Sequence, residues 1–495
     1  MKYQNPIIKG FHPDPSVCFA NGQFYMVNST FEYFPGLPIY TSKDLLNWES
    51  LPAVVQQHAQ VDLHKAKNSE GLFAATIREN KGTFYVVTTN ISTFQTLLFT
   101  TKNPMHGWSQ AIEIKIKGID PSLFFEGERT YLQFTGYIEQ QKKAIQQVEL
   151  NIMTGEIIEG PKLLSHGSGG RDVEGPHIYK KEGSYYLLAA EGGTREGHMI
   201  TIFKSNEVWG PYVSCANNPI LSNRDYPNEP LQSIGHGDLV QDNSKAWWLV
   251  CLGTRPYKHT TNMGRETLLY PVEWNGEWPV IHNGIASQYV DLADYPQHQA
   301  LMINPQVVEN FTSLVTEEGE INSEALFLRD DLSLRAVIDH NGVLLKGDQS
   351  YLEQQLPSLI GLRQTSKTSV FEVTIDLTEE KTNGGITVYI DSKHHSDLLV
   401  QKNDGEIFLT RRTRLKEIII QEKLQLIKGN EVVLSIGCSV EGYNFSIGKE
   451  RKHLYKIDAS FLSNEFSFGK NTGVICGIFA EGEGRLSCLS FTRQD

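Results

Sequence analysis

Residues Gly169 to Tyr186 read GGRDVEGPHIYKKEGSYY, and this segment decides the fold. It places one acidic residue, Glu174, before a short strand-like run that passes through a Gly-Ser turn into two tyrosines. A turn of glycine or polar residues followed by an apolar or alternating strand is typical of a β-hairpin. Glu174 precedes Tyr185 by eleven residues, and the same offset recurs in four other segments. The segment is therefore one copy of a repeated unit.

The repeat has five copies. The pairs that share the offset are Asp14 and Tyr25, Ala74 and Tyr85, Asp120 and Tyr131, Glu174 and Tyr185, and His236 and Trp247. The copies follow at intervals of about fifty residues, and a period of that size indicates a radial or stacked array of small sheets. A closed ring of five such sheets is a β-propeller, in which equivalent positions converge on the central channel. We therefore expect three carboxyl groups and one imidazole to meet at one mouth.

The repeat ends after Trp278, and the remaining chain has a different pattern. Residues 296–310 are polar and contain proline, as a linker does. Beyond them, short alternating runs such as SVFEVTIDL and EVVLSIGCSV are separated by Gly, Asn and Asp turns, which is typical of a β-sandwich. The sequence thus predicts an all-β chain: a five-bladed β-propeller over residues 1–295, a linker over 296–310 and a β-sandwich over 311–495.

Composition limits the class of protein. The 495 residues carry a formal net charge of -13, which argues against a nucleic-acid partner because such proteins usually present a basic face. The six cysteines form no CxxC pair and are expected to be free buried thiols. The start, MKYQNPIIKGFHPDPS, has no apolar signal core, and no segment has the length and apolarity of a membrane span. We expect a soluble, cytoplasmic protein without a membrane partner, and a homo-oligomer stays open.

Three carboxyl groups around one cavity suit glycoside hydrolysis. In that reaction one carboxylic acid protonates the leaving oxygen while a carboxylate activates water or attacks carbon. The sequence offers no Ser-His-Asp pattern, P-loop, HExxH or CxxC motif for another chemistry. Metal binding by the same carboxylates is the competing interpretation, but it needs more oxygen ligands than these positions offer.

The local sequence gives the acidic residues their context. Asp14 stands between Pro13 and Pro15, which restrict the backbone and aim its side chain reproducibly. The same Asp-Pro-Ser tripeptide recurs at Asp120, in the same position of the repeat. His177, three residues after the acidic residue of the fourth unit, is expected to be a hydrogen-bonded strand histidine rather than a catalytic one.

Other side chains are candidates for the pocket lining. Arg265 either forms a surface salt bridge with Glu266 or presents a guanidinium fork to a carboxylate or a sugar hydroxyl. Phe31 is either a packing residue or a platform for a sugar ring, and Phe73 either belongs to the core or faces the channel. Thr194 follows a Gly-Gly turn and is a candidate to face the pocket.

Several of these segments resemble glycoside hydrolase family 43. The motifs that carry the likeness are GFHPDPS, STFEYFPGLPIY, GIDPSLFF, VEGPHIY, AEGGT, GHGDLVQ and GRETLLYPVEW. Beyond the linker, LRDDLSLRAVIDHNGVLLKG is similar to the C-terminal β-sandwich of the branch that contains β-xylosidases and α-L-arabinofuranosidases. The likeness covers nearly the whole chain. It implies a five-bladed propeller and an inverting mechanism.

The resemblance also implies roles for single residues. Asp14 matches the general base, Glu174 the general acid, and Asp120 the residue that tunes and orients the acid. Arg265 matches an arginine that lines the sugar pocket, and His236 matches a histidine near the channel axis. In some relatives that histidine coordinates a calcium ion, usually through water. The resemblance therefore permits a structural Ca²⁺ in the channel and implies no required cofactor.

The aromatic positions agree with the family only in part. Phe31 and Phe73 match residues around the terminal sugar. However, Phe73 and Ala75 stand where the branch commonly has Trp or Tyr and then Pro, so we expect a pocket wall of different shape. Asp172 adds a negative charge close to Glu174 in the sequence, but the sequence alone does not show where its side chain lies relative to the acid.

These expectations define a reaction and its alternatives. We expect an inverting exo-glycosidase that releases terminal pentoses, α-L-arabinofuranosyl or β-D-xylosyl, from oligosaccharides derived from arabinoxylan or arabinan. Inversion needs room for a water molecule, so the carboxyl groups of Asp14 and Glu174 should lie about 6.5 to 9.5 Å apart. An endo-acting arabinanase and a non-catalytic sugar-binding propeller are the alternatives. The sandwich is expected to bury a propeller face, or to send a loop between Asn471 and Glu481 over the pocket mouth.

Overall fold

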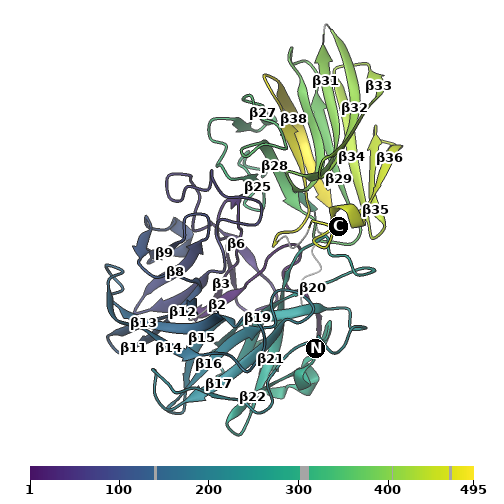
Figure 1. Cartoon of the computed structure of the whole chain (residues 1–495). Coiled ribbons are helices and arrows are strands. Elements are labelled where there is room, and N and C mark those ends of the chain that lie inside the picture. Colours follow the sequence, from purple (N-terminus) through teal and green to yellow (C-terminus); the bar gives the residue numbers. More distant parts are fainter. Residues whose placement is uncertain (139–141, 302–310, 404, 468–470) are drawn as a thin grey trace.

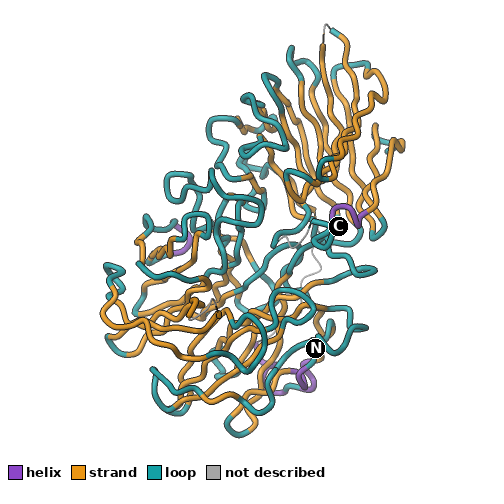
Figure 2. The backbone as a smooth tube through the Cα atoms, viewed as in Figure 1, coloured by secondary structure: helices purple, strands orange, loops and turns teal. Residues whose placement is uncertain are grey.

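The chain folds into a propeller and a sandwich that lie against each other (Figure 1). The computed structural model describes residues 1–138, 142–301, 311–403, 405–467 and 471–495. In these residues strands dominate, and helices are confined to short 3-10 turns (Figure 2). The turns are η1 (Pro104–His106), η3 (His282–Gly284), η4 (Leu292–Asp294), η5 (Pro296–Leu301) and η6 (Ala459–Leu462). The predicted all-β class is confirmed.

The propeller consists of five antiparallel sheets with four strands each. The first blade contains β2 (Ser16–Ala20), β3 (Gln23–Val27), β5 (Ile39–Ser42) and β6 (Glu49–Leu51), and the second β7 (Thr76–Asn80), β8 (Thr83–Asn90), β9 (Gln95–Thr101) and β10 (Ile112–Ile114). The third contains β11 (Ile119–Glu126), β12 (Arg129–Ile138), β13 (Lys142–Leu150) and β14 (Ile157–Ser165). The fourth contains β15 (Glu174–Lys181), β16 (Ser184–Glu191), β17 (Met199–Ser205) and β18 (Val213–Ser214), and the fifth β19 (Gln232–Gln241), β20 (Trp247–Thr254), β21 (Glu266–Asn275) and β22 (Trp278–Ile281).

The five blades close into a ring. Their innermost strands contact one another in the order β2, β7, β11, β15, β19 and back to β2. The N-terminal strand β1 (Lys2–Gln4) pairs with β23 (Tyr289–Asp291), so the start of the chain lies beside the segment that follows the fifth blade. The innermost strand of every blade therefore begins at the same mouth of the channel.

The repeat position of Glu174 differs from that of the other acidic residues by one residue. Asp14, Asp120 and His236 have left-handed backbone conformations, with φ of 52°, 54° and 47°. In the fourth blade this conformation falls on Gly175, with φ of 58°, while Glu174 pairs with Ala190 just before the irregularity. The same pairing irregularity lies in β11 between Ile119 and Ser122 and in β19 between Gly235 and Asp238, so Gly175 is the counterpart of Asp120 and His236. The strand pairing makes Tyr186, not Tyr185, the counterpart of Tyr131, so the count of eleven residues in the fourth unit began one residue too early. The expected exact equivalence of Glu174 is therefore wrong by one residue, although the side chain reaches the same mouth.

The sandwich contains two sheets of eight strands each. One sheet contains β24 (Phe311–Ser313), β26 (Ala336–Asp339), β27 (Gly342–Lys346), β29 (Ser369–Asp376), β34 (Glu431–Ser439), β35 (Gly442–Ile447), β36 (Lys452–Asp458) and β38 (Arg485–Gln494). The other contains β4 (Tyr33–Phe34), β25 (Leu326–Leu328), β28 (Ser358–Arg363), β30 (Asn383–Asp391), β31 (His394–Asn403), β32 (Glu406–Leu415), β33 (Ile418–Ile427) and β37 (Ile475–Ala480). The predicted sandwich is confirmed.

The two parts of the molecule share a sheet and a core. Strand β4, which belongs to the first propeller segment, pairs with β25 of the sandwich. One continuous apolar cluster joins propeller residues such as Val27 and Leu72 to sandwich residues such as Phe327 and Ile360. The sandwich therefore buries a face of the first two blades. This confirms the expectation that the second domain covers part of the propeller.

Three smaller expectations concern the linker, the cysteines and the membrane. The first residues of the predicted linker form η5, and residues 302–310 lie outside the described part of the chain, so the linker stays a prediction there. All six cysteines are free and buried, as expected. Among the described residues, no helix reaches the length and apolarity that a bilayer crossing requires.

Candidate active site

Asp14 is held at the mouth of the channel by three polar neighbours. Its side chain is buried, and its backbone is left-handed in the proline-flanked loop that leads into β2. Ser29 Oγ donates to Oδ2 at 2.6 Å, and Arg265 Nη1 donates to Oδ1 at 2.9 Å. His236 Nδ1 lies 3.7 Å from the same Oδ1. Each carboxylate oxygen thus accepts one hydrogen bond, and Arg265 holds a carboxylate as one of its two interpretations predicted, although through Nη1 alone.

These contacts keep Asp14 ionised. Burial by itself would raise the pKa of Asp14, because desolvation disfavours the charged form. The nearby Arg265 and His236 charges and the Ser29 hydroxyl outweigh burial and lower the pKa below its ordinary value. The alternative in which Arg265 pairs with Glu266 is wrong, since Glu266 instead accepts from Arg255 at 2.6 and 2.7 Å.

Asp120 and Glu174 are joined through the backbone of Gly175. The Gly175 N–H donates to Asp120 Oδ2 at 3.1 Å, which fixes the chain beside Glu174. A Cβ at residue 175 would meet the His236 ring at 3.2 Å, and the positive φ there also favours glycine. The structure therefore brings Asp120 and His236 beside the residue that follows Glu174, and His236 in turn lies 3.7 Å from Asp14.

The two carboxyl groups of this pair favour protonation, in contrast to Asp14. Burial, and then the negative charge of Asp120, raises the pKa of Glu174 well above its ordinary value. Burial, and then the charge of Asp14, likewise raises the pKa of Asp120. Because the two groups interact, they titrate as a pair that retains a proton near neutral pH.

A lysine that sequence reasoning missed also reaches this pair. Lys143, on β13, lies 3.1 Å from Glu174 Oε1 and 3.5 Å from Asp172 Oδ1. Its positive charge lowers the pKa of Glu174 in part, against the larger effect of burial. Asp172 also pairs with Arg171 at 2.8 Å, so its carboxylate forms ion pairs with both Lys143 and Arg171. No repeat position marks Lys143 in the sequence, because it comes from a middle strand of the preceding blade.

Two aromatic rings border the cluster. Phe31 is buried and lies edge-to-face with Phe73, with ring centroids 5.5 Å apart. The Arg265 guanidinium carbon lies 5.6 Å from the centre of the Phe31 ring. Phe73 is half-buried, and Ala75 is buried against the first two blades. The structure thus places Phe31 and Phe73 beside Arg265, while their contact with a sugar stays a prediction.

The sandwich contributes backbone to the same wall. Arg265 Nη2 donates to the Asn471 carbonyl at 3.4 Å, and the Asn471 N–H donates to Ser69 Oγ at 2.9 Å. The Val474 N–H donates to the Asn262 carbonyl at 2.7 Å. The expected loop is shorter than the range from Asn471 to Glu481, because β37 begins at Ile475 and is a paired strand of the sheet.

Thr194 is not joined to the cluster by any contact seen in the described residues. It lies in the loop between β16 and β17, and its side chain is exposed. Its place in the pocket therefore stays a prediction.

A ring of buried polar side chains fills the channel beneath the mouth. Arg78 donates from Nη1 to Asp238 Oδ2 at 2.7 Å and from Nη2 to Oδ1 at 2.9 Å. Arg78 Nη2 also lies 3.0 Å from His177 Nδ1, and Ser122 Oγ lies 2.9 Å from the same nitrogen. Burial lowers the pKa of His177 to about 3. His177 is therefore a hydrogen-bonded strand histidine, as predicted, whereas sequence reasoning missed the Arg78–Asp238 pair.

The residues around His236 do not fit a directly coordinated calcium ion. Calcium takes six to eight oxygen ligands, whereas His236 offers a ring nitrogen. The Asp238 carboxylate, on the same strand, is engaged by Arg78, and Asp14 is engaged by Arg265. A water-mediated site at His236 stays a prediction.

A closed five-bladed ring with one ionised carboxylate and a pair of carboxyl groups that together retain a proton at its mouth defines a propeller glycosidase. Residues 3–279 match the family Glycosyl hydrolases family 43, and residues 327–488 match the Beta xylosidase C-terminal Concanavalin A-like domain. The chain belongs to glycoside hydrolase family 43, whose members are inverting glycoside hydrolases.

Similar proteins extend over the full length of the chain. It is 34% identical to a non-reducing end alpha-L-arabinofuranosidase of Bacteroides ovatus, over 98% of this chain and 92% of that protein. It is 33% identical to a beta-xylosidase of Bacillus subtilis, over 97% and 95% of the two chains. The crystal structure of xylan beta-1,4-xylosidase from Bacillus halodurans superposes with a TM-score of 0.89, at 25% identity over 99% and 100% of the chains. Both the propeller and the sandwich are thus common to these proteins.

Proposed function

We propose that the protein is an inverting exo-glycosidase that releases terminal α-L-arabinofuranosyl or β-D-xylosyl residues from oligosaccharides derived from arabinoxylan or arabinan. The names of the similar proteins supply the two sugars. The observation that carries the proposal is the opposite direction of the pKa shifts of Asp14 and Glu174 within one cluster. Pairs of titratable groups whose environments separate their pKa values mark the base and the acid of a reaction.

In the proposed mechanism Asp14 is the general base. Its ionised carboxylate accepts a proton from a water molecule as that water attacks the anomeric carbon. Ser29 and Arg265 each donate a hydrogen bond to one oxygen of the Asp14 carboxylate. These two bonds fix the orientation of the carboxylate and therefore of its remaining lone pairs. The two carboxyl groups should be separated by the width of that water, about 6.5 to 9.5 Å.

Glu174 is the proposed general acid and Asp120 its partner. Glu174 donates its proton to the departing glycosidic oxygen, which requires the carboxyl group to be protonated in the resting enzyme. Asp120 supports this in two ways. Its charge raises the pKa of Glu174, and its hydrogen bond to the Gly175 N–H fixes the backbone next to the acid.

The exo-acting mode rests on the wall that the sandwich provides. Asn471 contacts both Arg265 and Ser69, so a segment of the second domain lies beside the residue that holds Asp14. A wall at this position allows only the end of a polysaccharide chain to reach the site. An endo-acting arabinanase would need the same side to be open.

Hydrolysis assays separate the alternatives. The purified protein should release nitrophenol from nitrophenyl α-L-arabinofuranoside, nitrophenyl β-D-xyloside or both, with free pentose as the product of oligosaccharides. Rapid shortening of linear arabinan without release of single sugars would indicate the endo-acting alternative. Sugar binding without any turnover would indicate a non-catalytic propeller.

The assignment of Glu174 has its own test. Glu174→Ala should reduce kcat/KM on oligosaccharides by about 10² to 10⁴-fold, the usual contribution of a general acid. It should reduce turnover of a nitrophenyl glycoside much less, because that leaving group departs without protonation. Equal losses on both substrates would contradict the role of Glu174. The cytoplasmic location and the absence of nucleic-acid and membrane partners stay predictions.

A further inference from the structure

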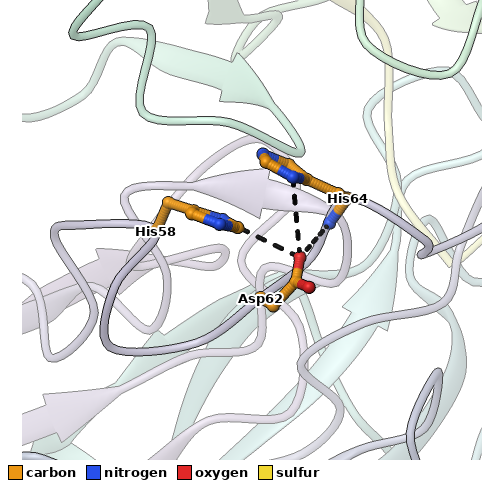
Figure 3. A group of neighbouring side chains, drawn as sticks. All are labelled: His58, Asp62 and His64. Atoms are coloured by element: carbon orange, nitrogen blue, oxygen red, sulfur yellow. Dashed lines mark hydrogen bonds and ion pairs between the residues drawn. The ribbon is translucent and has the colours of Figure 1, made fainter.

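A second cluster of metal-ligand side chains lies away from the propeller mouth. His58, Asp62 and His64 belong to the long connection between β6 and β7, and Figure 3 shows both rings beside the Asp62 carboxylate. One ligand atom from each residue lies within 4.8 Å of the other two. In the described part of the chain, no other group of three or more His, Cys, Asp or Glu side chains is close enough to hold a metal ion.

The distances approach those of a coordination sphere. His58 Nδ1 and His64 Nδ1 each lie 3.8 Å from Asp62 Oδ1. Metal–ligand bonds of about 2.0 to 2.1 Å at tetrahedral angles would separate the ligand atoms by about 3.4 Å. The two rings stack with centroids 3.8 Å apart and an angle of 11° between their planes. Because a ring nitrogen binds a metal in the plane of the ring, one ring has to tilt, and each separation from Asp62 Oδ1 has to shorten by about 0.4 Å.

Two carboxylates of the sandwich support the histidines from behind. Asp330 Oδ1 lies 3.6 Å from the ring nitrogen His64 Nε2, and Asp331 Oδ2 accepts the backbone N–H of His58 at 3.0 Å, which fixes the chain rather than the ring. A carboxylate behind one ring nitrogen favours the proton on that nitrogen, so the opposite nitrogen keeps a lone pair for a metal. At 3.6 Å the Asp330 carboxylate makes no hydrogen bond to His64 Nε2, but its negative charge favours a proton there, which leaves the Nδ1 lone pair on the side of Asp62.

Two ring nitrogens of the cluster, His58 Nδ1 and His64 Nε2, are buried without a hydrogen bond in the described residues. His58 Nδ1 has no hydrogen-bond partner among the described residues, although almost no solvent reaches it. Buried polar atoms are nearly always paired, so an isolated one needs an explanation such as an ion. The Asp62 carboxylate faces this nitrogen and its side chain is 60% exposed, which leaves a route for an ion from solvent.

We propose that His58, Asp62 and His64 bind one late first-row divalent metal ion, for which Zn²⁺ is the representative, and that this ion fastens the β6–β7 connection to the sandwich. Two imidazoles and one carboxylate suit Zn²⁺, Ni²⁺ or Cu²⁺, whereas Ca²⁺ and Mg²⁺ prefer oxygen ligands. Water fills the remaining coordination positions, since the site faces solvent.

The position of the site indicates what the ion does. The same connection is held to the sandwich by Gln355 Nε2, which donates to the His64 carbonyl at 3.0 Å. Farther along, Ser69 contacts Asn471 at the wall beside Arg265. The ion stabilises this interface without contacting substrate, so its removal should lower thermal stability more than it lowers kcat.

Metal titration of the full chain tests the proposal. After treatment with a chelator, the protein should bind one Zn²⁺ per chain with a rise in the unfolding midpoint, and Co²⁺ should give a visible absorption band of a site with nitrogen ligands. His64→Gln should weaken Zn²⁺ binding by at least about 10²-fold, and Asp330→Asn by about 10 to 10²-fold through loss of the supporting carboxylate. The matched control is His453→Gln, an exposed histidine of β36, which should bind Zn²⁺ like the unmodified chain.

Several outcomes would overturn the proposal. They are the absence of a saturable Zn²⁺ site, equal binding by His64→Gln and the unmodified chain, and Ca²⁺ binding as tight as that of Zn²⁺. If His64→Gln does not fold, Asp62→Asn decides the matter, because that side chain is mostly exposed and its loss should not disturb packing. Unchanged Zn²⁺ binding in Asp62→Asn would refute the site.

Discussion

The mouth of the channel and the layer beneath it lie along the same ring of inner strands, yet their carboxyl groups are compensated to different degrees. Beneath the mouth, the Asp238 carboxylate receives hydrogen bonds from Arg78, Ser16, Tyr179 and the Val17 N–H. The strong opposite charge of Arg78 overcomes burial and holds the pKa of Asp238 far below its usual range. At the mouth, three carboxyl groups share one guanidinium and one lysine.

The difference between the two layers shows which one is built for stability and which for chemistry. A carboxylate whose partners are all in place has one protonation state and contributes to a fixed structure. Carboxyl groups that are only partly compensated separate into an ionised and a protonated form, as Asp14 and Glu174 do. Four changes at the two layers test this contrast, beginning with the largest expected effect.

Asp14→Asn should abolish turnover. The variant cannot accept a proton from water, so kcat/KM should fall by about 10³-fold or more on nitrophenyl glycosides and oligosaccharides alike. Steady-state kinetics on both substrates measure this, with circular dichroism as the control for folding. Residual activity above about a tenth of the original value would contradict the role of Asp14 as base.

Asp238→Asn should destabilise the fold rather than change the chemistry. It leaves the Arg78 guanidinium buried without its counter-charge, and breaking a buried pair in this way costs about 3 to 5 kcal/mol. Denaturant unfolding at pH 7 gives the free energy of unfolding. Asp225→Asn, on an exposed side chain, is the control and should leave the midpoint unchanged.

The same variant gives a pH dependence with a definite sign. Because the folded state lowers the pKa of Asp238, its stabilising contribution is complete above the ordinary aspartate pKa of about 3.9 and is lost as the pH falls below it. The difference in unfolding free energy between the unmodified protein and Asp238→Asn should therefore shrink in acid. A constant difference from pH 7 to pH 3 would show that Asp238 does not act through its charge.

Asp120→Asn should shift the pH profile while keeping the backbone contact. Asparagine can still accept the Gly175 N–H, but the negative charge that raises the pKa of Glu174 is gone. The protonated fraction of the acid then falls at neutral pH, so the alkaline limb of kcat/KM should move to lower pH, with a loss of about tenfold at pH 7. A profile that only decreases in height, without moving, would assign Asp120 to structure alone.

Lys143→Met should have the smallest effect and the opposite sign. The positive charge of Lys143 lowers the pKa of Glu174, so its removal should move the alkaline limb to higher pH. Methionine preserves the length of the apolar stem, and Lys142→Met, on an exposed neighbour, serves as the control. A shift in the same direction as that of Asp120→Asn would contradict the electrostatic account.

The repeat and the linear motifs predicted most of the fold and the core of the site. The recurring offset of eleven residues predicted the convergence of Asp14, Asp120 and His236 because it reflects one hairpin geometry in each blade. It misplaced Glu174 by one residue, since the count ended at Tyr185 whereas the strand pairing makes the adjacent Tyr186 the counterpart of Tyr131, and two neighbouring tyrosines cannot be told apart by sequence pattern alone.

The remaining parts of the site depend on partners that no local pattern specifies. Lys143 reaches Glu174 from a different blade, and Arg78 reaches Asp238 across the channel. Asn471 meets Arg265 from the other domain. Such contacts follow from the closure of the ring and the docking of the sandwich, so they require three-dimensional coordinates.

The central claim is that Asp14 and Glu174 act as a separated base and acid on one water molecule and one glycosidic bond. Proton NMR of the sugar first released from a nitrophenyl glycoside tests it most directly, before mutarotation mixes the anomers. The account predicts that the first product has the anomeric configuration opposite to that of the substrate. A first product with the configuration of the substrate would contradict the account, since it requires a covalent intermediate and carboxyl groups only about 5 Å apart.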